Sequence, residues 1–253
     1  MTRASPGSPP RILPGSPPEV VVYDEPHACP YVGGRVAILP LRVPARQLLG
    51  SELDERLRAG DRRQGMFLYR TACPACRACE PIRLDVAEYL PSRSQRRVLA
   101  RADREVSLEV GPPVADERRV DLYNRHKLLR GLGDGEIDIG GYREFLVMTC
   151  CDSFEMRYRV GGRLVGIALV DRGATALSAV YCFYDPEFER LSLGTYSILK
   201  QVELCRAWGL AHLYLGLFIE DCDRMRYKAR FLPHERLVGG RWRHFARGPT
   251  PEP

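Results

Sequence analysis

The chain has 253 residues, of which 45% are hydrophobic and 28% charged, the composition of a globular protein with a sizeable core. It lacks both the long apolar run of a membrane span and, in residues 1–20, the apolar core of a secretory signal, so we expect no membrane association and a cytoplasmic location. The 38 Lys and Arg against 32 Asp and Glu give a net charge of +6. Most of these basic residues are arginine, which suits bidentate phosphate contact.

Composition divides the chain into four segments. Residues 1–19 and 248–253 are rich in Pro, Gly and Ser, and we predict that both are disordered tails. Residues 20–112 form a cysteine- and arginine-rich N-terminal domain, which the pair Pro112-Pro113 separates from a second domain. This second domain, residues 113–247, has a clearer rhythm of helices and strands and is large enough to fold alone.

The sharpest local signal in the first domain is a cysteine cluster at Cys73, Cys76 and Cys79. Three thiols at this spacing bracket tight turns and can converge on one metal, with Cys29 as the fourth ligand. The spacing is typical of zinc and of iron–sulfur sites, and it does not distinguish them. The alternative is a group of reduced thiols without metal, since nine cysteines without an export signal argue against a disulfide framework.

An arginine-rich run covers residues 92–104. In a helix, Arg93, Arg97, Arg101 and Arg104 share one face with Arg96 beside it, a stripe suited to successive phosphates of a nucleic acid. A charge run taken alone is more often only a solvated helix face, and that alternative stays open.

The sequence pattern of the second domain predicts a mixed order of helices and strands, that is, an α/β fold. The elements in chain order are a helix over 116–130, a short helix over 142–149, strands over 154–160 and 164–171 joined by Gly161-Gly162, a strand over 175–184, a helix over 192–208 closed by Gly209, a strand over 211–217, a helix near 221–230 and an edge strand near Trp242. Backbone amides at the helix start near Gly194 and Thr195 would form an anion site, although a plain strand-to-helix corner is the alternative.

Several motifs in this order resemble those of the aminoacyl-tRNA–protein transferases of the arginyl-transferase type, most closely the short bacterial members that transfer leucine. The motifs span about residues 29–243 and read Arg62-Arg63-Gln64-Gly65 with Tyr69-Arg70, Cys76-Arg77-Ala78-Cys79-Glu80-Pro81-Ile82-Arg83, Ser94-Gln95-Arg96-Arg97, Ala176 through Glu187, Ser192-Leu193-Gly194-Thr195-Tyr196, Tyr214-Leu215-Gly216, Met225-Arg226-Tyr227-Lys228-Ala229 and Phe231-Leu232-Pro233.

The resemblance implies an α/β, GNAT-like acyltransferase domain preceded by a smaller cysteine-containing domain. Two neighbouring strands, one through Ser178 to Tyr181 and one through Tyr214 to Gly216, would splay apart around the reaction. The donor would be aminoacyl-tRNA, with no cofactor required for transfer. The acceptor would be a protein beginning with Asp or Glu, and the product a signal for the degradation machinery. Leucine is the favoured amino acid, and arginine stays open.

The resemblance also suggests roles for individual residues. Orientation and deprotonation of the acceptor amine fall to Asp185 or Tyr184, with Ser178 as a further catalytic candidate on the same strand. The substrate-binding candidates are Arg93, Arg96, Arg97 and Lys228 for tRNA phosphates, Tyr181 and Tyr227 for stacking on the terminal adenosine, Arg83 for the acceptor carboxylate, and Gly194, Thr195 and Tyr214 along the cleft. Iron–sulfur binding in eukaryotic relatives supports a metal at Cys29, Cys73, Cys76 and Cys79.

One departure and two rivals limit this interpretation. Family members usually carry Ala-Arg-His where this chain has Leu129-Arg130-Gly131, so no histidine at that place is available as a base. A coenzyme A-dependent N-acetyltransferase would share the fold, but Arg190 through Gly194 is off the expected loop spacing by one residue. A non-enzymatic, metal-containing RNA-binding protein is the second rival.

Overall fold

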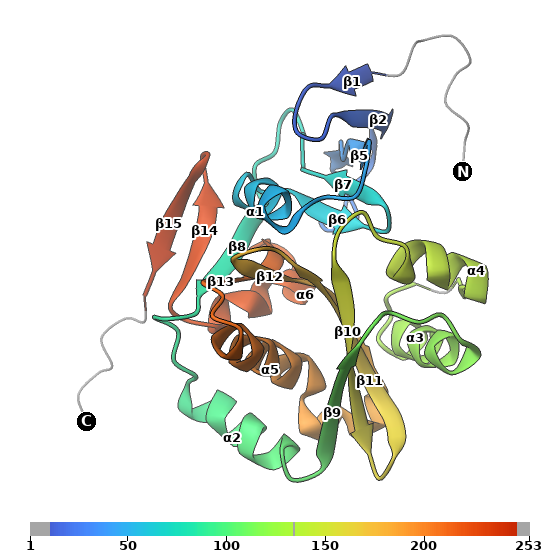
Figure 1. The fold of residues 1–253 in the computed structure, drawn as a ribbon, viewed down its shortest axis with the longest axis vertical. Coiled ribbons are helices and arrows are strands. Elements are labelled where there is room, and N and C mark those ends of the chain that lie inside the picture. Colours follow the sequence, from blue (N-terminus) through green and yellow to red (C-terminus); the bar gives the residue numbers. More distant parts are fainter. Residues whose placement is uncertain (1–10, 134, 247–253) are drawn as a thin grey trace.

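The computed structural model describes residues 11–133 and 135–246, and its elements form a small β-rich N-terminal unit and a larger α/β body (Figure 1). The N-terminal unit contains one helix and a five-stranded antiparallel sheet in the order β1-β2-β5-β7-β6, together with a separate two-stranded pair. Its elements are β1 (Arg11–Leu13), β2 (Glu19–Tyr23), β3 (His27–Ala28), β4 (Val36–Ala37), β5 (Leu41–Pro44), α1 (Gly50–Arg58), β6 (Arg62–Gln64) and β7 (Phe67–Tyr69).

The body is built on an eight-stranded sheet in the order β15-β14-β8-β13-β12-β11-β10-β9. The strands are β8 (Glu80–Asp85), β9 (Val106–Gly111), β10 (Ser153–Val160), β11 (Arg163–Arg172), β12 (Ala176–Tyr184), β13 (His212–Phe218), β14 (His234–Val238) and β15 (Arg241–Phe245). All neighbours pair antiparallel except β12 and β13, which run parallel.

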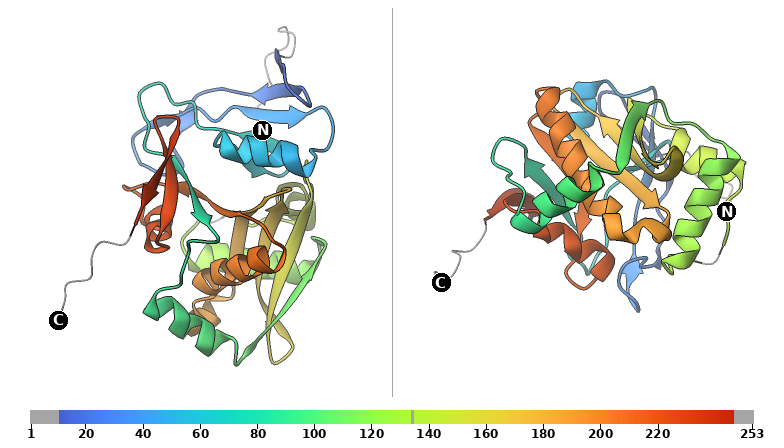
Figure 2. Two further views of the ribbon diagram at one scale, coloured as in Figure 1. Left: turned by 60° about the vertical axis from the view of Figure 1, so that its left-hand side comes forward. Right: turned by 90° about the horizontal axis from the view of Figure 1, so that it is seen from below.

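Helices cover both faces of this sheet (Figures 1 and 2). They are α2 (Arg93–Ala102), α3 (Glu117–Leu129), α4 (Ile139–Tyr142) continued by the π-helical turn Arg143–Val147, α5 (Leu193–Ala207) preceded by the 3₁₀ turn Pro186–Leu191, and α6 (Asp223–Arg226) continued by the 3₁₀ turn Tyr227–Arg230. The apolar sides of α2 and α5 share one core cluster, and α3 and α4 share another. None of the helices in residues 11–133 and 135–246 combines the length and apolar character needed to cross a bilayer.

The pairing of β12 with β13 is short. It covers only Ala176–Ser178 against His212–Tyr214, although both strands continue well beyond these residues. The register of β12 against β11 shifts between Ala179 and Tyr181, and a bulge of this kind bends the strand away from its neighbour. The two strands therefore diverge after Ser178, which confirms the splayed pair expected from the sequence.

Most predicted elements of the second domain are confirmed. Asp116 caps α3 by accepting the Arg119 N–H at 2.9 Å, and Gly161-Gly162, both at positive φ, form the turn between β10 and β11. The last predicted helix is instead one short turn of α6 followed by a 3₁₀ turn, and the predicted edge strand is β15.

Two predictions about the first third of the chain need correction. Residues 11–13 of the predicted disordered tail pair with β2, and Glu19, also in that predicted tail, is buried and bound by Arg42 and Arg56. Residues 1–10 and 248–253 lie outside the described part. The sheet also crosses the predicted boundary at 112–113, since β8 lies between β13 and β14 and β9 forms the far edge. Residues 20–112 are therefore not a separate unit of the sheet.

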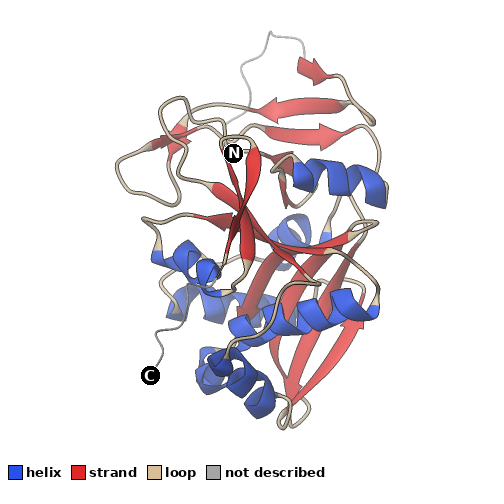
Figure 3. Ribbon diagram, turned by 90° about the vertical axis from the view of Figure 1, so that its left-hand side faces the viewer, coloured by secondary structure: helices blue, strands red, loops and turns tan. Residues whose placement is uncertain are grey.

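Contacts at one end of the sheet join the N-terminal unit to the body (Figure 3). The Asp54 carboxylate of α1 accepts hydrogen bonds from the N–H and the hydroxyl of Thr175, both at 2.7 Å, just before β12. Arg63 of β6 donates from Nε and Nη2 to Asp171 of β11, at 2.8 and 2.7 Å. Only 2% of the Arg63 side chain and 1% of the Asp171 side chain are exposed, so this ion pair is almost completely removed from water.

Replacement of Asp171 by Asn should strongly destabilise the protein, because Arg63 would be left buried without its counter-charge. We expect a loss of about 3–5 kcal/mol in the free energy of unfolding, measured by urea denaturation. Glu109→Gln, which removes a half-exposed partner of Arg157, is the matched control and should cost at most about 1 kcal/mol. Equal midpoints for the two variants would contradict this account of the contact.

Candidate functional site

The guanidinium of Arg62 lies against the diverging part of β12. Arg62 Nη1 donates to Ser178 Oγ at 3.0 Å, and Nη2 donates to the Ala179 carbonyl oxygen at 2.8 Å. Arg62 is 8% exposed, and among the described residues it makes no ion pair with a carboxylate. Arg62 stands in one of the family motifs, but the sequence alone assigned it no role.

Gly216 on β13 faces the same place. Its φ of +90° is a left-handed conformation that favours glycine, and a Cβ here would lie 3.1 Å from Arg62 Nη2 and 3.3 Å from Lys228 Nζ. Lys228, from the turn after α6, donates to the Leu217 carbonyl oxygen at 2.9 Å. Burial, reinforced by the positive charge of Arg62, lowers the pKa of Lys228 to about 7. The tRNA-phosphate role predicted for Lys228 does not fit this inward position.

The end of β12 carries a second group of side chains. Tyr184 accepts a hydrogen bond from Arg130 Nη1 at 2.8 Å, and burial raises the pKa of the Tyr184 phenol. Buried His126 of α3 has Nδ1 2.8 Å from the Tyr184 carbonyl oxygen and 3.1 Å from its N–H, and its tautomer decides which bond forms. Sequence reasoning missed His126, whose only signal is a lone histidine within a predicted helix.

The two tyrosines predicted to stack on adenosine lie in different clusters. Tyr181 packs against Tyr123 and Phe145, at ring-centroid distances of 5.9 and 5.8 Å, on the α3 side of the sheet. Tyr227 packs against the core cluster on the α5 side and lines a cavity. Only Tyr227 therefore lies near the start of α5.

This cavity, of about 230 Å³, lies between the starts of α2 and α5 and the turn after α6. Its lining residues are Ser92, Ser94, Gln95, Val98, Thr195, Tyr227, Arg230 and Phe231. Ser192, at the N-cap of α5, has a φ of +52° and makes no side-chain capping bond, so backbone N–H groups at the helix start have no side-chain acceptor there. The predicted anion site at Gly194 and Thr195 thus adjoins a cavity lined with hydroxyl groups.

The predicted arginine stripe is on α2 and the turn that follows it, with the start of α2 beside the same cavity. Arg93, Arg96, Arg97, Arg101 and Arg104 are all exposed. Arg96 donates to the Pro91 carbonyl oxygen at 2.7 Å, whereas in the part of the chain that the structure describes the other four form no ion pair. These four charges are free to meet an external anion.

Asp185, the leading candidate base from the sequence, lies outside the gap. Its side chain is 1% exposed, one oxygen accepts from Arg125 Nη2 at 3.2 Å, and the other is bound by Arg163. It also accepts the Glu187 N–H at 3.1 Å, which caps the turn after β12. This geometry fits a structural anchor better than a proton acceptor.

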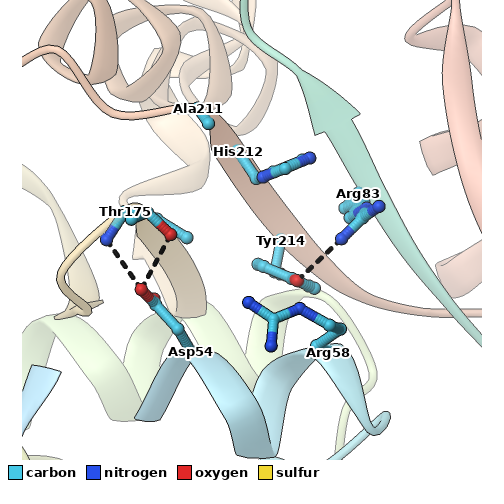
Figure 4. A pocket seen from close by; sticks show the side chains of 8 residues that line it. Asp54, Arg58, Arg83, Thr175, Ala211, His212 and Tyr214 are labelled. Carbon is cyan, nitrogen blue, oxygen red and sulfur yellow. Dashed lines mark hydrogen bonds between the residues drawn. The ribbon is translucent and has the colours of Figure 1, made fainter. Parts of the chain in front are cut away.

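Arg83 lies in a different cavity, of about 210 Å³, where α1 meets the start of β13 (Figure 4). Arg83 Nε donates to Glu235 Oε2 at 2.7 Å, Nη1 donates to the Tyr214 hydroxyl at 3.0 Å, and the guanidinium lies 4.2 Å from the Trp242 ring centroid. The charge that was expected to meet an acceptor carboxylate already has a carboxylate partner inside the protein.

The four predicted metal ligands lie near one another. Burial raises the pKa of Cys79 to about 12, and the thiols of Cys29, Cys73, Cys76 and Cys222 add to that shift. In residues 11–133 and 135–246, however, no three Cys, His, Asp or Glu side chains are arranged to hold one metal ion. The thiols do not fit a metal as they stand, and a metal here stays a prediction from the resemblance.

The fold and site together define a class. A sheet with two parallel central strands that diverge, and a helix that begins at the open end of the gap, is a GNAT-like acyltransferase arrangement. Family models agree: the N-terminal model of arginine-tRNA-protein transferase matches residues 27–97 and the C-terminal model matches residues 118–238. The chain belongs to the arginine-tRNA–protein transferase family, and it is an aminoacyl-tRNA–protein transferase.

Similar proteins include an aspartate/glutamate leucyltransferase of Chromobacterium violaceum, 39% identical over 225 residues, which are 88% of this chain and 93% of that protein. A protein of the same name from Alkalilimnicola ehrlichii is 39% identical, over 85% and 91% of the two chains. Among solved structures, FemX aligns with a TM-score of 0.45 at 10% identity, over 74% and 65% of the chains. The C-terminal domain of a putative lysylphosphatidylglycerol synthetase from Agrobacterium fabrum aligns with a TM-score of 0.45 at 12% identity, over 56% and 47%.

Replacement of Asp185 by Asn separates anchoring from catalysis. The variant keeps the cap but loses two charge-assisted contacts, so we expect it to unfold more easily by roughly 1–3 kcal/mol. Transfer per folded molecule should fall less than tenfold, since loss of a general base costs about 10²–10⁴-fold. Denaturation and initial rates measured on the same preparation test this. Unchanged stability with a hundredfold slower reaction would return the base role to Asp185.

Proposed function

We propose that this protein transfers leucine from leucyl-tRNA to the α-amine of proteins that begin with Asp or Glu. The names of the relatives support this donor and this acceptor. The observation that carries the proposal is a group of neighbouring features: exposed arginines on α2, a cavity at the start of α5, and the divergence of β12 from β13. Such an arrangement suits a nucleic-acid end that carries a small acyl group.

The donor enters on the α5 side. The exposed arginines of α2 contact backbone phosphates of the acceptor stem, and a phosphate near the 3′ end meets the N–H groups at the start of α5. Tyr227 offers a ring face to the terminal adenosine, and Arg130 supplies a charge beside Tyr184. We keep Gly194 and Thr195 as donor-site residues in this scheme.

The chemistry needs positioning more than activation, because the aminoacyl ester is already reactive. The acceptor nitrogen, in its neutral form, attacks the ester carbon, the bond to the ribose oxygen breaks, and a proton from the nitrogen ends on that oxygen. A free α-amine has a pKa of about 8, so a substantial fraction is neutral without a strong base. The Tyr184 N–H points away from β11 and toward His126. Cys182 lies two residues earlier on the same strand, so its N–H faces the same edge of β12. This N–H is our candidate donor to the developing oxyanion.

The product, a protein with a new N-terminal leucine, would be read by the degradation machinery. One substrate is a charged tRNA and the other is a protein with a newly exposed N-terminus. We therefore assign the reaction to the cytoplasm. Transfer in this scheme requires no cofactor.

Incubation of the protein with labelled leucyl-tRNA and peptides that begin with Asp, Glu, Lys or Ala tests the proposal. We expect leucine on the Asp and Glu peptides only. Parallel arms use arginyl-tRNA and acetyl-coenzyme A, so that label from either donor identifies arginyl transfer or acetylation instead. Binding of tRNA without any labelled peptide would favour an RNA-binding protein and would contradict the proposed reaction.

The α2 arginines supply a second prediction. Combined replacement of Arg93, Arg97 and Arg101 by Ala should weaken tRNA binding and flatten its dependence on salt, by about 0.7–0.9 in the log–log slope per lost phosphate contact. Arg243→Ala, which removes an exposed arginine of β15, is the control and should change neither quantity. Filter binding over a range of salt concentrations measures both. An identical slope in the triple variant would place the tRNA elsewhere.

A further inference from the structure

Two cationic side chains converge in the gap without an acidic partner. Arg62 Nη2 and Lys228 Nζ lie 3.1 and 3.3 Å from one point above Gly216, so they are at most 6.4 Å apart, the sum of these two distances. Their hydrogen-bond acceptors are all neutral: the oxygens of Ser178, Ala179 and Leu217, and the sulfur of Met225, which lies 3.1 Å from Lys228 Nζ. Among the described residues, neither forms an ion pair with Asp or Glu.

The lack of a nearby negative charge affects the pKa of Lys228. The groups whose charges act on it are Arg62 of β6, which lowers its pKa, and the thiol of Cys222 before α6, which raises it, and burial dominates both. Two other enclosed arginines of the N-terminal unit have carboxylate partners: Arg42 bridges Glu19 and Asp61, and Arg63 holds Asp171. A bound anion in the gap would therefore be stabilised by the charge of Arg62 and would itself favour the protonated form of Lys228.

On the basis of the proposed function, we propose that Arg62 and Lys228 bind the side-chain carboxylate of the acceptor's N-terminal Asp or Glu and thereby set acceptor specificity. A carboxylate has two oxygens, and each can accept one hydrogen bond from these nitrogens. The α-amine of the same residue is only a few bonds from this carboxylate. When the carboxylate is bound in the gap, the amine therefore lies close to the edge of β12, where the scheme places the ester carbon. Glutamate, one methylene longer, reaches the same nitrogens.

This assignment moves acid recognition from Arg83 to the gap. Arg83 already holds Glu235, and its cavity lies where β12 and β13 are still paired, away from their diverging ends. Arg62 and Lys228 instead occupy the diverging part itself. A positively charged or neutral first residue would leave both cations without a counter-charge, which accounts for selection against such acceptors.

Two variants and one control test the inference. Arg62→Gln keeps a donor for Ser178, and Lys228→Met keeps the length of the side chain. Each should raise the acceptor KM for Asp and Glu peptides by about tenfold to a hundredfold, with leucyl-tRNA affinity unchanged. Arg83→Gln is the control and should leave the acceptor KM within about threefold. Wild-type protein that moves no leucine would refute the proposed function itself, whereas loss of acidic selectivity in Arg83→Gln would overturn only this inference.

A spectroscopic measurement on the wild-type protein does not depend on any variant folding. The sequence contains only three lysines, Lys127, Lys200 and Lys228, so lysine-selective isotope labelling gives three side-chain NMR signals. We expect the Lys228 signal to titrate near pH 7, and an Asp-initiated peptide to raise that midpoint by about 1–3 pH units. An Asn-initiated peptide should leave it unchanged. An unshifted Lys228 midpoint with saturating Asp peptide would overturn the inference. So would kinetics in which both variants lower the turnover rate at saturating acceptor and leave the acceptor KM unchanged.

Discussion

Divergence of two strands in the middle of a sheet exposes backbone groups that would otherwise pair, and Arg62 satisfies this requirement. Its guanidinium donates to the Ala179 carbonyl oxygen and to Ser178 just where β12 leaves β13. The next residue, Arg63, fixes β6 to β11 through Asp171. Two consecutive arginines from the N-terminal unit thus hold the gap open and position that unit over the sheet. In the proposed function, the N-terminal unit therefore contributes Arg62 to the transfer site.

The distribution of arginine partners explains what net charge alone does not. In the N-terminal unit, Arg42 and Arg56 are bound to Glu19, and Arg42 and Arg70 to Asp61. Arg42 and Arg56 are largely enclosed by the fold, and each of the three arginines already has a carboxylate partner. On α2 the arginines are exposed and, among the described residues, form no ion pair, and these are the residues that we propose meet the phosphates of tRNA. The start of this helix also lies next to the open start of α5.

Local signals predicted most of the body. Asp116 at a helix start, the turn Gly161-Gly162 and the stop at Gly209 are short-range features, and α3, the β10–β11 hairpin and α5 agree with them closely. The site was harder, because its contacts join distant residues: Arg62 and Ser178 are 116 positions apart. Asp185 stands in a conspicuous Asp-Pro pair, but its partners Arg125 and Arg163 come from α3 and β11, and no local pattern reveals that it is already occupied. Sequence alone likewise placed β8 in the wrong unit, because the alternating pattern of a strand does not indicate which strands pair with it.

The position of β8 has a consequence for biosynthesis. This strand leaves the ribosome early, yet its two neighbours in the sheet, β13 and β14, are among the last elements to be made. Until they emerge, both edges of β8 present unpaired N–H and C=O groups, and such edges readily join other chains. The nascent protein therefore has to keep β8 shielded through most of its own translation, and premature termination after β12 leaves a fragment in which β8 has neither of its neighbouring strands.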